Sequence, residues 1–284
     1  MSSEESTRFQ TGELGRAGAR ARVFAPLRRI VVNGLIFLAP IAVVVLLWQG
    51  MTIASGWPKY LLPEPLVVAE TFWNLLTSGV LLNNLLASMG RLLIGCVAAF
   101  VLAVPLGYAI GTSRIADRMF SPVVSVTQPI PGIAWIPLAI LWFGLGPLAV
   151  GFVIFLSAFF PILLNTTTGV RTVTRELIRV GRVFQFPRRM MVFDVVLPSA
   201  LPYIVTGVRL GFGYGWRALV AGEMIAASSG LGSMIFEARD FLRTDEVIVG
   251  MITIGLFWAA VERLLLRRIE KQTIEKWGLA SAAA

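Results

Sequence analysis

The sequence contains no histidine, the residue that proteins most often use as a general base near neutral pH and as a metal ligand. Its single cysteine, Cys96, lies inside an apolar run, so an intrachain disulfide is excluded. No stretch matches the phosphate-binding pattern G-x-x-x-x-G-K-[ST], so we expect no ATP hydrolysis by this chain alone. Charged residues make up only 14% of the chain, where a soluble domain has roughly a quarter. We therefore predict no catalytic residue, no metal site and no soluble domain.

Apolar residues dominate what is present. They make up 56% of the 284 residues, and the mean hydropathy is +0.78. About 20 apolar residues span the hydrocarbon of a bilayer as a helix. On this basis the chain is predicted to be an all-α, polytopic membrane protein with about six transmembrane helices. The expected spans are 30–53, 85–110, the two halves of 119–170 on either side of a turn at 144–147, 195–222 and 247–261.

Local signals refine this plan. Pro129 and Pro131 should kink or interrupt the third span, because proline removes a backbone hydrogen bond from a helix. Residues 67–76 are predicted to form a short amphipathic helix on the outer surface. The sequence SSGLG at 228–232 predicts a turn between the fifth and sixth spans.

Three regions follow from the composition. Residues 1–29 are polar and rich in arginine and glycine, and we interpret them as a cytoplasmic N-terminal tail. A cleaved signal peptide is the competing interpretation, but the apolar run that follows is too long and lacks a small-x-small cleavage site. Residues 30–270 form the transmembrane domain, and residues 271–284 a cytoplasmic C-terminal tail.

The distribution of basic residues predicts the orientation. Net charge is +9, and most of the 25 Lys and Arg residues fall in the two tails and in the loops 111–118 and 171–194. Only Lys59, Arg239 and Arg243 fall in the opposite set of loops. Lysine and arginine concentrate on the cytoplasmic side of membrane proteins. Both termini are therefore expected in the cytoplasm, which makes the net charge a topological signal and excludes nucleic acid as the implied partner.

The most informative cytoplasmic segment is 171–198, RTVTRELIRVGRVFQFPRRMMVFDVVLP. Leu177, Val180 and Phe184 recur at helical spacing and predict an apolar stripe beside arginines. Pro187 suits the start of a second short helix. An apolar stripe on a cytoplasmic helix either rests on lipid headgroups or is covered by a partner protein, and both interpretations stay open from the residues alone.

Arg91, Arg209 and Arg217 fall within the expected spans, which were assigned no acidic residue. An arginine inside the membrane is costly without a partner, so each is a functional candidate. Backbone carbonyls, water, the nearby Glu223 or an anionic solute could satisfy these charges. A structural ion pair or snorkelling to the interface is the alternative.

Several stretches resemble the permease subunits of ABC importers. The segment 179–185, RVGRVFQ, is followed thirteen residues later by Pro198 and resembles the cytoplasmic loop by which such permeases engage their ATPase. Further matches to the nitrate, sulfonate and taurine branch cover roughly residues 65–270: SMGRLLIG at 88–95, ILWFGLG at 140–146, FFPI at 159–162, LPSALP at 197–202, GVRLG at 207–211 and AASSGLG at 226–232. The chain departs from the loop motif in having Arg179 for its glutamate and Gln185 for its turn glycine.

The resemblance implies a type I permease fold with a cytoplasmic coupling helix, in the bacterial cytoplasmic (inner) membrane and surrounded by lipid. It implies a pair of permeases, expected to be a homodimer with two related permeases as the alternative. It also implies two ATPase subunits that bind ATP and Mg²⁺, and a periplasmic or lipid-anchored solute-binding protein. This chain would then be no enzyme itself, although the assembled complex hydrolyses ATP. The solute would be a small anion of the sulfonate, taurine or nitrate type. A pyrimidine vitamin precursor and, in a different class, a secondary carrier or channel are the alternatives.

The resemblance and the residues together give two candidate sites. The residues expected to couple to the ATPase are Leu177, Arg179, Val180, Gly181, Arg182, Phe184, Gln185 and Arg188. The residues expected to line the translocation path are Arg91, Gln128, Trp135, Arg209, Arg217 and Glu223. For Trp135, anchoring at the membrane interface is the favoured alternative.

Overall fold

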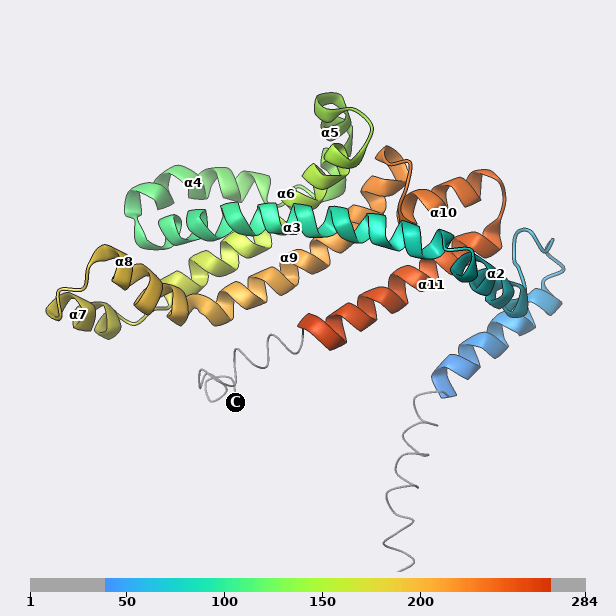
Figure 1. Ribbon diagram of the computed structural model, residues 1–284, viewed down its shortest axis with the longest axis horizontal. Coiled ribbons are helices and arrows are strands. Elements are labelled where there is room, and N and C mark those ends of the chain that lie inside the picture. Colours follow the sequence, from blue (N-terminus) through green and yellow to red (C-terminus); the bar gives the residue numbers. More distant parts are fainter. Residues whose placement is uncertain (1–38, 267–284) are drawn as a thin grey trace, which may run out of the picture. The chain divides into compact units, whose positions relative to one another are not determined.

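The computed structural model describes residues 39–266, and every regular element in that part of the chain is a helix (Figure 1). The predicted all-α class is therefore confirmed. The helices are α2 (Pro65–Thr77), α3 (Val80–Thr112), α4 (Arg114–Thr127), the 3-10 turn η1 (Gly132–Trp135), α5 (Ile136–Phe143), α6 (Pro147–Arg171), α7 (Arg175–Val183), α8 (Arg188–Met190), the π-helical η2 (Met191–Val196), α9 (Leu197–Ala226), α10 (Leu231–Asp240), α11 (Thr244–Val261) and the π-helical η3 (Glu262–Leu266).

The chain divides into two units, residues 1–67 and 68–284. The described part of the first unit holds the apolar helix Ala39–Ala54, in which Trp48 Nε1 donates a hydrogen bond to the Pro63 carbonyl at 3.1 Å. The expected first span, 30–53, begins outside the described residues. The tails predicted at 1–29 and 271–284 also lie outside them.

Four helical stretches in the second unit are long and apolar enough to cross a membrane: Val80–Thr112, Pro147–Arg171, Arg188–Ala226 and Thr244–Leu264. They correspond to four of the expected spans. The remaining expected span is the bent pair Arg114–Thr127 and Gly132–Phe143, whose axes differ by 92°. The break contains Pro129 and Pro131, so of the two predicted outcomes, a kink or an interruption, the structure shows the interruption.

Other sequence signals are also confirmed. Helix α2 occupies the stretch predicted as a short amphipathic helix, and α6 begins at Pro147 directly after the turn at 144–146. Gly230 adopts a φ of 109° in the predicted turn before α10. Helix α9 continues to Ala226, so Glu223 lies inside a span, and the expectation that spans contain no acidic residue was wrong.

Three helices, α3, α6 and α9, form the centre of the second unit (Figure 1). Their core contains Ala99, Ala103, Ala158, Ile162 and Leu163, which are almost completely buried. Small residues let the helix backbones approach closely, which is how membrane helices gain packing energy when the surroundings are as apolar as the interface. This tight centre fixes the positions of the side chains described below.

Gly207 on α9 shows how close the approach is. A Cβ added there would lie 2.8 Å from Asn165 Cβ and 3.2 Å from the Pro161 carbonyl oxygen on α6. Gly207→Ala is therefore expected to lower the free energy of unfolding by about 1–3 kcal/mol. A Cβ added at Gly90, in α3, would have no neighbour within 4 Å, so Gly90→Ala should leave the free energy of unfolding unchanged or slightly raised. Denaturation in mixed detergent and SDS measures both, and equal effects of the two substitutions would contradict the proposed close packing.

Candidate functional site

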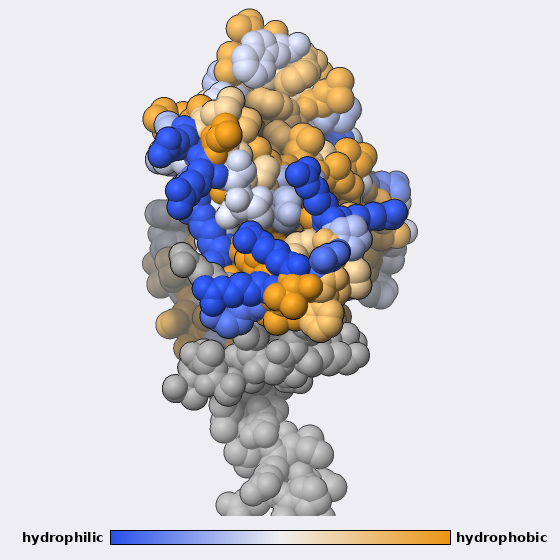
Figure 2. All heavy atoms as spheres, turned by 90° about the vertical axis from the view of Figure 1, so that its left-hand side faces the viewer, coloured by the Kyte–Doolittle hydropathy of each residue, from blue (hydrophilic) through white to orange (hydrophobic). Residues whose placement is uncertain are grey.

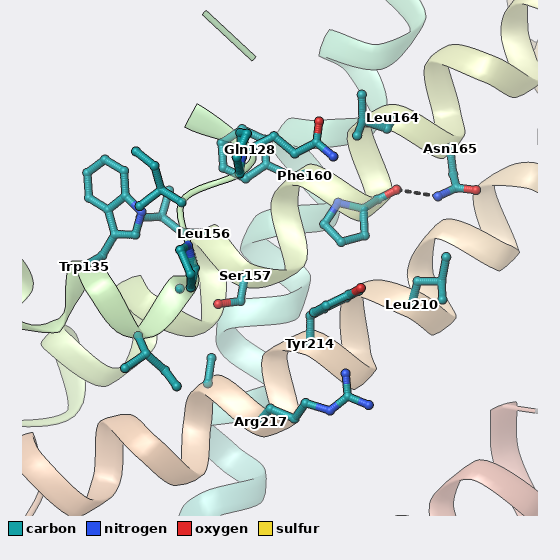
Figure 3. Close-up of a pocket in the computed structure, with 17 residues that line it drawn as sticks. Gln128, Trp135, Leu156, Ser157, Phe160, Leu164, Asn165, Leu210, Tyr214 and Arg217 are labelled. Carbon is teal, nitrogen blue, oxygen red and sulfur yellow. Dashed lines mark hydrogen bonds between the residues drawn. The ribbon is translucent and has the colours of Figure 1, made fainter. Parts of the chain in front are cut away.

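A cavity of about 580 Å³ lies where the break between α4 and η1 faces α6 and α9 (Figure 3). Prolines hold the break open because they cannot continue the hydrogen bonding of α4. Gly132 then passes so close to α6 that an added Cβ would overlap Ser157 Oγ. The cavity is lined by Gln128, Pro129, Ile130, Pro131, Gly132, Ile133, Trp135, Leu156, Ser157, Phe160, Pro161, Leu164, Asn165, Leu210, Tyr214, Arg217 and Ala218.

Among the residues from 39 to 266, Arg217 is the only charged one that lines this cavity. It lies one helical turn from Tyr214 on α9, and its guanidinium carbon is 5.6 Å from the centre of the Tyr214 ring. Figure 3 shows both side chains rising from α9 towards the same side. Arg217 is exposed and makes no ion pair with any residue from 39 to 266. Its charge is thus available to a ligand or to a second protein chain.

Arg91, unlike Arg217, forms an ion pair within the chain. It donates to Glu223 Oε1 at 2.6 Å and to the Ser229 carbonyl at 2.7 Å. Glu223 is completely buried, and Ser88 Oγ and the Gly232 backbone N–H also donate to its carboxylate, at 2.8 and 3.0 Å. The carboxylate sits at the amino end of α10, where the helix dipole favours negative charge. Arg91 and Glu223 therefore form a closed network that joins α3, α9 and α10.

Arg209 also has a carboxylate partner. It donates to Glu262 Oε1 at 2.8 Å, which links α9 to η3, and both side chains are about one-third exposed. Arg209 does not line the cavity.

The structure thus brings together three of the six residues predicted for the translocation path: Gln128, Trp135 and Arg217. Sequence reasoning missed three polar residues of the same cavity, Ser157, Asn165 and Tyr214. A signal was available for two of them, since Asn165 is an amide in an apolar run and Tyr214 lies three residues before Arg217 on one helix face.

The residues predicted to couple to the ATPase lie on α7 and just after it, at the end of the second unit opposite to α10 (Figure 1). Helix α7 packs inward through Ile178, which contacts a core cluster of α6 and α9, and through the buried Gly181, whose added Cβ would lie 2.5 Å from Met191 Cε. Leu177, Val180 and Phe184 are 46%, 50% and 70% exposed. The predicted apolar stripe therefore exists, and no residue of the described range 39–266 covers it.

Exposed Arg179, Arg182 and Arg188 lie around this stripe. Figure 2, which views this end of the molecule, shows strongly hydrophilic side chains around apolar surface. Such a surface has the composition of a protein docking site, with an apolar centre and a polar rim.

Gln185 ends α7 in a left-handed conformation, with φ of 52°. Its N–H bonds the Arg182 carbonyl, and the Phe186 N–H bonds the Gly181 carbonyl at 2.9 Å. Gln185 therefore forms the turn at the position where the related motif has glycine, and it does so in the left-handed conformation that glycine adopts freely.

Gln185→Gly is consequently expected to raise the free energy of unfolding by up to about 1 kcal/mol, because it removes left-handed strain at the cost of some backbone entropy. Thermal denaturation of the purified protein measures the change. Phe186→Gly, at a residue without a positive φ, serves as the control and should be destabilising. Destabilisation by both would contradict strain at Gln185.

Comparisons with known proteins identify the family. The model described as "Binding-protein-dependent transport system inner membrane component" matches residues 93–269. The putative aliphatic sulfonates transport permease protein SsuC of Bacillus subtilis is 35% identical over 236 residues, which cover 81% of this chain and 84% of that protein. The taurine transport system permease protein TauC of Escherichia coli is 32% identical, over 82% and 87% of the two chains. The nitrate import permease protein NrtB of Synechocystis is 32% identical, over 79% and 84%.

A solved structure agrees on the fold. A chain of the inward-facing MetNI methionine ABC transporter superposes with a TM-score of 0.55 at 19% identity, over 67% of this chain and 96% of that one. Together with the apolar helices, the matches confirm a multi-pass membrane permease that resembles the nitrate, sulfonate and taurine branch. This chain belongs to the family of binding-protein-dependent transport system inner membrane components and is a permease subunit of an ABC importer.

Proposed function

We propose that the chain carries a small anionic solute of the sulfonate, taurine or nitrate type into the cell, and that the solute passes through the cavity beside Arg217. Family membership implies an ATPase and a solute-binding protein as partners. The finer assignments are part of the proposal: a permease homodimer, two ATPases that hold ATP and Mg²⁺, a periplasmic or lipid-anchored binding protein, and both termini in the cytoplasm.

The observation that carries the proposal is the cavity itself. It lies at a broken span, between two central helices, and presents one cation that has no carboxylate partner among the described residues. Non-helical backbone at membrane depth is stable only where protein buries it or a water-filled cavity borders it. An unpartnered arginine at that depth favours an anionic solute over a neutral vitamin precursor.

A second copy of the chain is needed to close the cavity. Gln128, Tyr214 and Arg217 are exposed in the single chain, and lipid is a poor neighbour for such groups. A partner permease across this face would enclose the polar side chains together with water. The path would then run between two copies, as is common where two repeats or subunits rock about a central site.

Helix α7 supplies the connection to the ATPase in this proposal. From Arg188 to Ala226 the helix is continuous through α8, η2 and α9, and α7 packs on its start. Displacement of α7 would therefore move the face of α9 that bears Leu210, Tyr214 and Arg217. The π-helical turn η2 (Met191–Val196) lies between α7 and α9, and it is where we expect the continuous helix to deform most readily.

The test is uptake in proteoliposomes that contain the permease, its ATPase and its binding protein. We expect labelled solute to accumulate only when ATP and the binding protein are both present. Uptake at the same rate without the ATPase would instead establish a secondary carrier or channel. An ATPase-deficient variant of the partner, in the same vesicles, is the control for leakage.

A further inference from the structure

An ion pair connects the α7 end of the second unit to the broken span. Arg171 Nη2, at the end of α6, donates to Asp117 Oδ1 on α4 at 2.7 Å. Asp117 lies in the first turn of α4 and also accepts a hydrogen bond from Ser121 Oγ. Figure 1 shows the start of α4 at the same end of the second unit as α7. The Arg171–Asp117 ion pair thus joins two helices whose paired residues are 54 positions apart in the sequence.

Arg171 is packed together with α7. Only residues 172–174 separate it from the start of that helix. Within this connection, Val173 is buried in a core cluster with Val196 of η2, and Ile178 of α7 packs against the same cluster. Close-packed side chains transmit a displacement because they leave no space to absorb it. A movement of α7 would therefore move Arg171 with it.

Helix α4 is held less firmly than the three central helices. Val124 is its only buried residue, and it packs in the core cluster with residues of α3 and α6. Ile115 and Val126, in contrast, are largely exposed. The Arg171–Asp117 ion pair is the only one that α4 makes with any residue from 39 to 266. The position of the start of α4 relative to α6 therefore depends strongly on this ion pair.

The position of α4 matters to the cavity because α4 leads directly into the break. Gln128 and Pro129 follow α4 and line the cavity, and Tyr214 and Arg217 line it from α9 (Figure 3). The continuous helix 188–226 connects α7 to the α9 side of the cavity only. Movement of the side formed by the break needs a connection of its own.

We propose that the Arg171–Asp117 ion pair passes movement of α7 on to the broken span, so that both sides of the cavity respond to the ATPase. Neither residue lines the cavity, so the ion pair is a positioning contact rather than part of the path. The inference rests on the proposed function, because it adds a second connection from the same coupling helix to the same cavity.

The strength of the ion pair limits the size of its effect. The side chains of Arg171 and Asp117 are 49% and 41% exposed. Exposed ion pairs contribute little free energy, and a contact can bias a conformational equilibrium by no more than it contributes. Loss of the ion pair is therefore expected to reduce the response of the broken span about twofold to fivefold, and not to abolish it.

The experiment follows each side of the cavity separately, in permease–ATPase complexes in nanodiscs. In a chain that carries Cys96→Ser, the cysteine of Gln128→Cys reports on the broken span and that of Tyr214→Cys reports on α9. The rate of reaction with a small water-soluble thiol reagent is measured without nucleotide and with ATP bound to a hydrolysis-deficient ATPase. We expect ATP to change the rate at both positions, and no transported solute is needed for the measurement.

Two substitutions remove the ion pair, Asp117→Asn and Arg171→Gln. Either should reduce the ATP-induced change at Gln128→Cys about twofold to fivefold and leave the change at Tyr214→Cys as it was. The two substitutions combined should act no more strongly than either alone. Arg171→Lys keeps the charge and should preserve the response.

Arg118→Gln is the matched control. It removes an exposed arginine next to Asp117 that forms no ion pair with any residue from 39 to 266, and it should leave both responses unchanged. An equal response at Gln128→Cys with and without the ion pair would overturn the proposal. So would an equal loss at both positions, because the ion pair would then act on ATPase binding or on the fold as a whole.

Failure of the proposed function gives a different result. If ATP changes the rate at neither position in the chain with an intact ion pair, α7 does not couple the ATPase to the cavity, and the proposed function fails together with this inference. If both positions respond and removal of the ion pair alters neither response, only the role assigned to Arg171 and Asp117 is lost.

Discussion

Arg91→Met is expected to lower the free energy of unfolding by about 3–5 kcal/mol. The substitution leaves the completely buried Glu223 carboxylate without its cation, and an uncompensated buried charge is strongly destabilising. The Ser229–Gly232 turn, which Arg91 and Glu223 hold against α3, should loosen at the same time. Denaturation in mixed detergent and SDS, followed by circular dichroism, measures the loss.

Two further variants make this prediction specific. Arg91→Met combined with Glu223→Gln removes both charges and should cost less than Arg91→Met alone. Arg239→Met removes an arginine whose side chain is 58% exposed and paired with Asp240, and it should change the free energy of unfolding by less than about 1 kcal/mol. Additive effects of the two substitutions at 91 and 223 would show that the residues do not form one unit.

Phe184→Ser is expected to weaken association of the permease with its ATPase by about tenfold to a hundredfold, with a parallel loss of uptake. The phenyl ring is 70% exposed on α7, and burying such a ring against a partner contributes about 1.5–3 kcal/mol. Co-purification of the two subunits and surface plasmon resonance measure the affinity.

Phe241→Ser is the matched control, because Phe241 is 67% exposed at the opposite end of the second unit, in the turn between α10 and α11 (Figure 1). It should leave the affinity for the ATPase unchanged. Equal losses of affinity from Phe184→Ser and Phe241→Ser would contradict the assignment of α7 as the surface that binds the ATPase. Unchanged affinity in Phe184→Ser would favour the alternative in which the stripe rests on lipid.

The main features of the fold could be predicted because they depend on local chemistry. Apolar length predicts the spans, prolines predict the break after α4, and the spacing of Leu177, Val180 and Phe184 predicts the exposed face of α7. The π-helical turns at Met191–Val196 and Glu262–Leu266 could not be predicted, since such turns depend on tertiary packing and no residue pattern in these two segments marks them.

The partners of the intramembrane arginines could not be predicted for a related reason. Arg91 and Glu223 are 132 residues apart, and Arg209 and Glu262 are 53 apart. Their pairing depends on how α3, α9 and η3 are arranged. The sequence placed Glu223 in a loop because the polar stretch after it resembles one, whereas α9 runs three residues further. Only the structure therefore distinguishes Arg217, which lines the cavity, from the two arginines that have carboxylate partners.

Site-directed labelling of α7 in intact cells tests most directly whether this helix is the surface that the ATPase holds. In a chain that carries Cys96→Ser, the cysteine of Arg182→Cys should react with a membrane-impermeant maleimide only after the cytoplasmic membrane is permeabilised. A cysteine at Phe241 should react from outside in intact cells. Reaction of the Arg182→Cys variant in intact cells would contradict the proposed coupling role of α7, because a cytoplasmic ATPase could then not contact this helix.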